Sequence, residues 1–210
     1  VNFAVRPGKV MCLAGENGCG KSTLVKIISG VYTRDEGEVL FEGKPIQHIT
    51  PAESSALGIQ VIYQDLSIFP NLTVMENLAI NSEITANRRI VNRKRWEQTA
   101  KEALSKIGYD IDLYAKMGDL SVADKQLVAI CRALLFNAKL IIMDEPSATL
   151  TERELDALFN IIDILKERGV TVIYISHRME EIFKIADTVS VLRDGMHIDT
   201  LPVADVDRPK

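Results

Sequence analysis

Nine residues near the start of the chain, Gly15 to Thr23, have the types and spacing of a phosphate-binding loop. They match the pattern G-x-x-x-x-G-K-S/T without a mismatch. The glycines would let backbone N–H groups converge on phosphate oxygens, and the start of a following helix would add a favourable partial charge. Lys21 would reach the β- and γ-phosphates of a triphosphate, while the Ser22 hydroxyl would bind Mg²⁺. The residues expected to contact the nucleotide are Gly15, Glu16, Asn17, Gly18, Cys19, Gly20, Lys21, Ser22 and Thr23.

The sequence on both sides of this loop supports the interpretation. An apolar run, Val10 to Ala14, precedes the loop and is typical of a buried strand. Residues Leu24 to Ser29 after it are compatible with a helix that Gly30 would end. The alternative is a glycine turn with an unrelated lysine, which this strand–loop–helix context disfavours.

Two acidic residues, Asp144 and Glu145, directly follow the apolar run Leu140 to Met143. Beside a phosphate loop, the end of such a strand is where a second Mg²⁺ contact is needed, and Asp144 suits that role. Glu145 could then accept a proton from the water that attacks the γ-phosphate. Alone, the pair could equally be two solvated acids at a strand end.

Two further polar residues are expected at the ends of strands. His177 follows the β-branched run Val170 to Ser176 and could contact the γ-phosphate and hold the attacking water. A lone histidine is more often structural, but ligands of open α/β sheets bind at the carboxyl ends of strands, which strengthens the catalytic interpretation. Gln64 ends the run Ile59 to Tyr63 and could touch the metal or the water, the alternative being a surface glutamine.

Composition limits the class of protein. The 210 residues can bury one sizeable core, and 47% hydrophobic with 26% charged residues is ordinary for a globular protein. The net charge of −4 argues against binding nucleic acid through bulk electrostatics. No apolar run is long enough to span a membrane, and the three cysteines form no C-x-x-C pair, which favours a reducing compartment. The chain begins with Val1, and we interpret it as a fragment of a longer protein.

Strands and helices are expected to alternate on both sides of a purely helical stretch. Capping boxes begin helices at Thr50 and Thr151, and Asp194-Gly195 predicts a hairpin turn. Glu38 to Phe41 and the residues after Gly43 predict a short antiparallel pair. The fold class is therefore α/β, with a mostly parallel sheet, flanking helices, a small antiparallel β subdomain and an inserted helical lobe. We expect one domain, residues 1–210, with a catalytic lobe (1–64 and 140–210) and a helical lobe (65–139).

The order of these motifs resembles that of the ATP-binding cassette ATPases, which have the P-loop NTPase fold. The match covers nearly the whole chain: Walker A (Gly15 to Thr23), Q-loop (Gln64), signature region (Leu120 to Gln126), Walker B (Leu140 to Glu145) and switch histidine (His177). Stretches such as NLTVMENLAI and YISHRMEEIFKIAD are similar to the first of two fused cassettes in bacterial importers of ribose, galactose, arabinose or xylose.

This resemblance implies an ATPase that uses ATP and Mg²⁺ and couples hydrolysis to uptake of a monosaccharide. Two cassettes would close head to tail, each ATP lying between one Walker A motif and the partner's signature, where Ser121 would contact phosphate. The implied partners are a second cassette, transmembrane permease subunits docked around Asp65 to Ile80 and, indirectly, a periplasmic or extracellular sugar-binding protein, with no nucleic acid. The implied location is peripheral, on the cytoplasmic face of the cell membrane.

Three features depart from the family pattern. The signature, usually LSGGQ, has Val122 and Ala123 in place of glycines, so side chains crowd the surface a nucleotide would approach. Thr151 stands where the family usually has Asp after Walker B. The adenine-stacking aromatic would lie before Val1, and Phe3 is a poor substitute because we expect it to pack within a strand. Two alternatives stay open: a soluble cassette of DNA repair or translation, and a regulatory module that binds ATP with little turnover.

Overall fold

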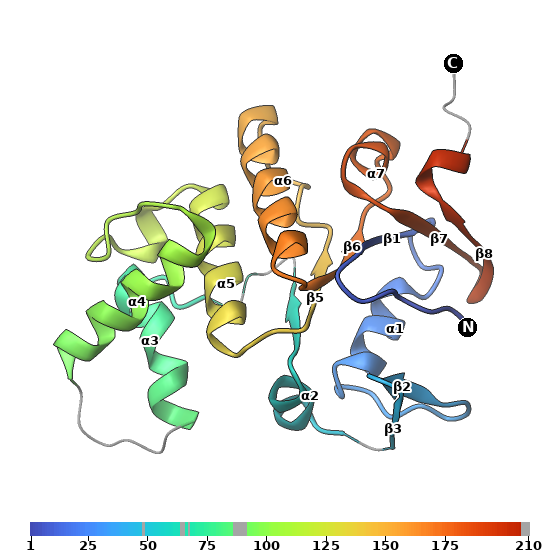
Figure 1. Ribbon diagram of the computed structural model, residues 1–210, viewed down its shortest axis with the longest axis horizontal. Coiled ribbons are helices and arrows are strands. Elements are labelled where there is room, and N and C mark those ends of the chain that lie inside the picture. The colour runs from blue at the N-terminus through green and yellow to red at the C-terminus, as the bar shows by residue number, and fades with distance from the viewer. Residues whose placement is uncertain (48, 64–65, 67, 86–91, 207–210) are drawn as a thin grey trace.

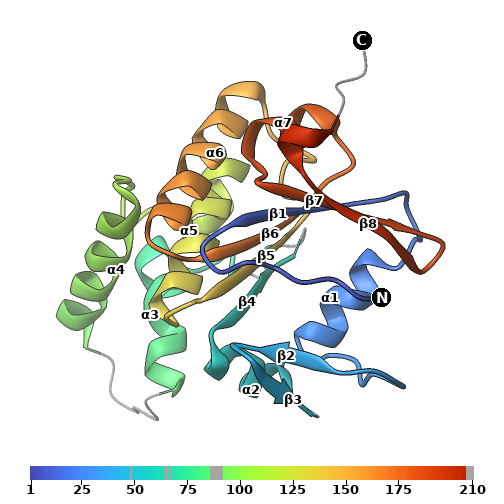
Figure 2. The ribbon, with the colours of Figure 1, turned by 45° about the vertical axis from the view of Figure 1, so that its right-hand side comes forward.

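The computed structural model describes the chain except for residues 48, 64–65, 67, 86–91 and 207–210. Its centre is a six-stranded sheet in the order β4-β5-β6-β1-β7-β8, parallel except for the antiparallel β7–β8 pair. Figure 2 shows these strands edge to edge. They span Ile59–Ile62 (β4), Leu140–Asp144 (β5), Thr171–Ile175 (β6), Val10–Ala14 (β1), Thr188–Arg193 (β7) and Met196–Pro202 (β8).

Both faces of the sheet are buried along β1, β5 and β6, which explains why these strands are apolar runs and not alternating ones, whereas the edge strand β8 is largely exposed. Alternate residues of β1 belong to two different cores: Val10 and Cys12 face one, and Met11 and Leu13 face the other. The same division holds along β5 and β6. Successive side chains of β1, β5 and β6 therefore pack on opposite faces of the sheet, one in each core.

The smaller core lies between the sheet and α1 (Lys21–Ile28) together with the antiparallel pair β2 (Val39–Phe41) and β3 (Lys44–Ile46). The helix α2 (Pro51–Leu57) leads into β4. Phe3 packs partly against this core from an irregular segment, so the expectation that it belongs to a strand is wrong.

The larger core lies on the opposite face, under the remaining helices (Figures 1 and 2). Within it, α3, α4 and α5 pack against one another, and α5 also contacts β4 and α6. These helices are α3 (Val74–Thr85), α4 (Arg93–Ile107), α5 (Val122–Leu135), α6 (Glu152–Glu167) and α7 (Met179–Ile185). Single 3₁₀ turns, Met117–Asp119 and Val203–Asp205, complete the described elements.

Local signals in the sequence set the helix ends. Thr50 and Thr151 form complete capping boxes with Glu53 and Glu154, as predicted. The Asp194-Gly195 turn joins β7 to β8, also as predicted. The predicted fold class is confirmed: a mostly parallel sheet, flanking helices and a small antiparallel pair. None of the described helices combines the length and the apolar character that crossing a membrane requires.

Candidate functional site

The phosphate loop joins β1 to α1, and two glycines determine its shape. Gly20, just before α1, has a left-handed backbone with φ 103°, and no described side chain caps the helix. A Cβ atom at Gly15 would lie 2.3 Å from the carbonyl oxygen of Leu192 and 2.6 Å from Cys19 Sγ, so only glycine fits. The first amide groups of α1 have no acceptor within the helix and can donate to an anion.

Lys21, the first residue of α1, is nearly buried, with 6% of its surface exposed. Its Nζ donates to the carbonyl oxygens of Gly15 (2.7 Å) and Glu16 (2.9 Å) and lies 3.8 Å from Cys19 Sγ. The ammonium group is thus held by the loop itself and not by the core. The next residue, Ser22, is exposed, as are Glu16, Asn17, Gly18 and Thr23.

Asp144 and Glu145 lie at the end of β5, as the sequence predicted. Burial, and then the charge of Glu145, raise the pKa of Asp144, while Lys21 and Lys26 act in the opposite direction. Glu145 has a left-handed backbone, φ 47°, which is uncommon for a residue with a side chain. Its N–H donates to the carbonyl oxygen of Ile175 at 3.1 Å, which holds this turn against the end of β6. Such strained positions cluster at functional sites.

His177 follows the end of β6 and lies beside Glu145. Its Nδ1 is 3.4 Å from Glu145 Oε1, and its side chain is 61% exposed. The two residues meet because β5 and β6 are parallel neighbours in which Asp144 pairs with Ile175. A carboxylate and an imidazole at this distance, both open to solvent, can share a water molecule and move its proton.

Ser121 lies apart from this cluster, at the start of α5 on the other face of the sheet from α1 (Figure 1). Its Oγ accepts from the Asp124 amide (3.1 Å) and donates to Asp124 Oδ2 (2.9 Å). Tyr109 donates to Asp124 Oδ1 at 3.0 Å. The predicted helix cap is therefore present, and its hydroxyl is already engaged within the chain.

Gln64, predicted to touch the metal or the water, lies outside the described residues. Within the described part of the chain, no three Asp, Glu, His or Cys side chains gather as a metal-binding group. A Mg²⁺ ion held by one carboxylate, one hydroxyl and phosphate oxygens requires no such group.

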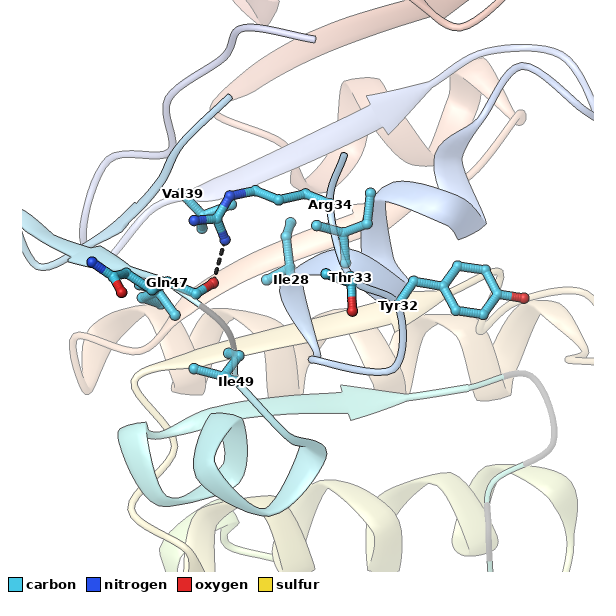
Figure 3. A pocket seen from close by; sticks show the side chains of 9 residues that line it. Ile28, Tyr32, Thr33, Arg34, Val39, Gln47 and Ile49 are labelled. Atoms are coloured by element: carbon cyan, nitrogen blue, oxygen red, sulfur yellow. Dashed lines mark hydrogen bonds between the residues drawn. The ribbon is translucent and has the colours of Figure 1, made fainter. Parts of the chain in front are cut away.

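A hollow lies at the far end of α1 from the phosphate loop (Figure 3). Ile28, Tyr32, Val39 and Ile49 contribute to its walls, and Arg34 spans it with a hydrogen bond from Nη1 to the carbonyl oxygen of Gln47. Its volume of about 30 Å³ is far below that of a nucleotide pocket, which is at least roughly 300 Å³. This hollow is therefore too small to hold a nucleotide.

A polar cluster behind His177 was not predicted from the sequence. Glu181 on α7 is 2% exposed and accepts hydrogen bonds from three hydroxyl groups. The sequence signal is weak: Glu181 shares a helix face with the apolar Ile185 four positions later, but α7 has only seven residues. Gln126 was also missed as a contact: its Nε2 donates to the carbonyl oxygen of Pro146 at 2.7 Å, which ties α5 to the turn after β5.

Family comparison agrees with this geometry. The family model described as ABC transporter matches residues 1–148. A solved ATP-binding cassette of an ABC transporter in its ADP conformation is 33% identical, with a TM-score of 0.84 over 96% of this chain and 83% of that chain. A nucleotide-free cassette is 31% identical, with a TM-score of 0.81 over 95% of this chain and 83% of that chain. The chain belongs to the ABC transporter family.

Among curated proteins, the chain is similar to ribose import ATP-binding proteins named RbsA. The Geobacillus kaustophilus protein is 48% identical over 206 residues, which are 98% of this chain and 42% of that protein. The Bacillus subtilis protein is 42% identical over 207 residues, which are 99% of this chain and 42% of that protein. The chain thus spans about two fifths of the length of these curated relatives. The resemblance to sugar-import cassettes is confirmed by these matches.

Proposed function

We propose that the chain is an ATP-binding and ATP-hydrolysing cassette of an importer. The observation that carries this proposal is the juxtaposition at the end of β5 and β6. Glu145 and His177 lie 3.4 Å apart, and Asp144, one residue before Glu145, is close enough to Lys21 for the lysine charge to oppose the rise that burial and Glu145 cause in the pKa of Asp144. Phosphoryl transfer to water requires hydrogen-bond donors that hold the phosphates, a metal ligand and a proton acceptor.

Each residue then has a role in the hydrolysis of ATP. The open amides of α1 and Lys21 hold the phosphates, and the loop glycines keep side chains away from them. Glu145 accepts a proton from the attacking water, and His177 orients that water against the γ-phosphate. Gln64 completes this set, as the family order of motifs suggests.

Mg²⁺ fits the donor set of the site, because Asp144 offers a partly buried carboxylate and Ser22 an exposed hydroxyl close to the phosphate loop. Gln64 is a third candidate ligand. When bound, the ion would neutralise charge on the phosphates. Ionised Asp144 is needed to hold it.

The RbsA relatives support a carbohydrate as the transported substrate, ribose being the one their names state. Their length supports a second cassette in the same polypeptide. An importer cassette of this kind works with transmembrane permease subunits and, through them, with a sugar-binding protein outside the membrane. We place the chain on the cytoplasmic face, with residues 1–64 and 140–210 as the catalytic lobe and 65–139 as the lobe that meets the permease.

The test uses the full-length protein with its permease in proteoliposomes. We expect saturable binding of a fluorescent ATP analogue, Mg²⁺-dependent release of phosphate, and ATP-dependent uptake of labelled ribose in the presence of the sugar-binding protein. If phosphate is released but another pentose or hexose is taken up in place of ribose, the proposed ATPase activity stands and the proposed sugar is wrong. Absence of nucleotide binding would overturn the proposal.

A second candidate, a regulatory cassette with little turnover, is favoured by one observation. Ser121, expected to serve the partner's ATP, is engaged by Asp124, and Val122 beside it is 39% exposed on the same turn. Single-turnover measurements on the full-length protein distinguish the two functions. Bound ATP that stays intact over many minutes, at wild-type affinity, would favour regulation.

A further inference from the structure

Glu181 is a buried carboxylate that joins the two segments carrying the proposed catalytic groups. Its Oε2 accepts from Ser147 Oγ (2.8 Å), Ser176 Oγ (2.8 Å) and Tyr174 OH (2.9 Å). Its Oε1 pairs with Arg178 Nη1 at 2.8 Å. Three hydroxyl donors therefore satisfy Oε2, while Oε1 has the charge of Arg178 beside it but accepts no hydrogen bond from the described residues.

Two of the three hydroxyls belong to neighbours of the catalytic candidates. Ser147 lies two residues after Glu145, in the turn whose Ala148 amide donates to the Glu145 carbonyl oxygen at 3.4 Å. Ser176 immediately precedes His177 and also accepts from the Arg178 amide at 3.1 Å. Tyr174 donates from within β6, and its ring packs edge-on against Phe159.

We propose that Glu181 is a positioning residue for ATP hydrolysis, acting through Ser147 on Glu145 and through Ser176 on His177. The inference rests on the proposed ATPase function. One carboxylate oxygen links both backbone turns, so the Nδ1–Oε1 separation of 3.4 Å depends on a side chain that is only 2% exposed. A shift of about 1 Å in a catalytic group can lower turnover by roughly 10²-fold.

A purely structural role for Glu181 makes a different prediction. A buried ion pair is often replaceable by apolar packing without loss of stability, so stability alone does not require a carboxylate here. If Glu181 only stabilises the fold, removing any of the three hydroxyls should lower stability, and turnover should fall only as far as stability does, whichever segment carries the hydroxyl. If Glu181 positions catalytic groups, Ser147 and Ser176 should affect turnover and Tyr174 should not.

The experiment compares Ser147→Ala, Ser176→Ala and Tyr174→Phe in the full-length protein. Each variant removes one donor to the same oxygen, so Tyr174→Phe controls for the loss of that hydrogen bond; Ser176→Ala also removes the acceptor of the Arg178 amide. We expect kcat to fall roughly tenfold in each serine variant, with unchanged ATP affinity, and to stay within about twofold in Tyr174→Phe. Turnover that tracks the melting temperature across all three variants would overturn the proposal.

Two further measurements make the result specific. In a His177→Ala background, Ser176→Ala should lower kcat no further, because it acts through His177, and additive losses would contradict this. The imidazole signal of His177 in histidine-labelled full-length protein, assigned by its loss in His177→Ala, should shift in Ser176→Ala and not in Tyr174→Phe. This signal needs no nucleotide, so it tests positioning even if wild-type turnover, and with it the proposed function, is absent.

Discussion

Helices α1 and α5 begin in opposite ways, although the family pattern assigns a phosphate to each N-terminus. The first turn of α1 contains no acidic residue, and no described side chain caps it. The first turn of α5 is capped by Ser121 and contains Asp124, whose carboxylate accepts from both Ser121 and Tyr109. One helix start leaves its amides open to an anion, and the other is occupied by an anion of its own.

This difference indicates that the two nucleotide sites of a closed pair of cassettes would not be equivalent. The site on the phosphate loop keeps Asp144, Glu145 and His177 and would take its signature from the partner. The partner's ATP would meet α5, where Asp124 adds negative charge and Val122 adds bulk. We therefore expect the phosphate loop of this chain to bind and turn over ATP, and α5 to support the partner's turnover poorly.

The largest expected effect is that of Lys21→Ala. Removing an ammonium group that faces phosphates should weaken ATP binding by roughly 10³-fold, because the loop then lacks its only charged donor among the described residues. The fold should persist, since Lys21 bonds to loop carbonyls and not to the core. Titration with a fluorescent ATP analogue measures the loss, and circular dichroism checks the fold. Lys26→Ala, on the same helix, is the control, and wild-type affinity in Lys21→Ala would disprove the assigned role.

Glu145→Gln should have the next largest effect. The amide keeps the shape of the side chain but cannot take a proton, so turnover should fall by roughly 10²–10³-fold while ATP binding is retained. In the full-length protein this variant should accumulate as a closed, ATP-bound form, visible by size-exclusion chromatography or cross-linking. Glu180→Gln, an exposed position on α7, is the control. Unchanged turnover would move the base to another residue, with His177 the first candidate.

Restoring the two glycines of the signature tests the α5 side of the comparison. Val122→Gly with Ala123→Gly should raise turnover several-fold at the partner's site only, because bulk is removed where the partner's ATP would approach. Glycine costs a helix up to about 1 kcal/mol per residue, so Lys101→Gly with Glu102→Gly, at two exposed positions of α4, controls for a weakened helix.

The independence of the two sites follows from the same variant. The ATPase gain of Val122→Gly with Ala123→Gly should survive when Glu145→Gln disables the other site. A gain that disappears in the Glu145→Gln background would mean that the two sites fire as one coupled unit. The hydrogen bond from Gln126 to Pro146 offers a direct connection from α5 to the Glu145 turn in that case.

The sequence was sufficient wherever the information is local. Capping boxes at Thr50 and Thr151, the loop glycines and the apolar strands each depend on residues within a few positions of one another, and the structure contains all of them. The meeting of Glu145 and His177 was also predictable, because parallel strands deliver their carboxyl ends to one edge.

The parts that escaped prediction depend on segments far apart in the chain. The placement of β1 between β6 and β7 is set by packing across the whole sheet. The cluster around Glu181 combines Ser147, Ser176 and Tyr174 from two other segments, and α7, with seven residues, is too short to show a clear periodicity. The left-handed backbone of Glu145 has no local signal either, since glycine would be the usual residue there.

The smallest expected effect concerns Asp144 and the stability of the nucleotide-free protein. Burial and the adjacent Glu145 raise the pKa of Asp144 in the folded state. The unfolded chain then releases this proton at lower pH than the folded chain, so ionisation of Asp144 destabilises the fold as pH rises above the unfolded value, about 3.9. Asp144→Asn should therefore raise the melting temperature at pH 7 by roughly 2–4 °C, and the gain should shrink as pH falls toward 4.

Asp156→Asn is the control for this last effect, because Asp156 is exposed and forms an ion pair with Lys184 at the surface, where ion pairs contribute little. It should produce no pH-dependent gain in melting temperature. With Mg²⁺ and ATP added, the wild type should have a higher melting temperature than Asp144→Asn. The wild type gains stability from the bound ligand, and Asp144→Asn gains less because it lacks the carboxylate that holds the ion. A gain in Asp144→Asn that is the same at pH 4 and pH 7 would show that the buried charge is not its cause. If Asp144→Asn keeps its higher melting temperature in the presence of Mg²⁺ and ATP, Asp144 is not a ligand of the metal ion. The contrast between the sites at α1 and α5 would then be weaker.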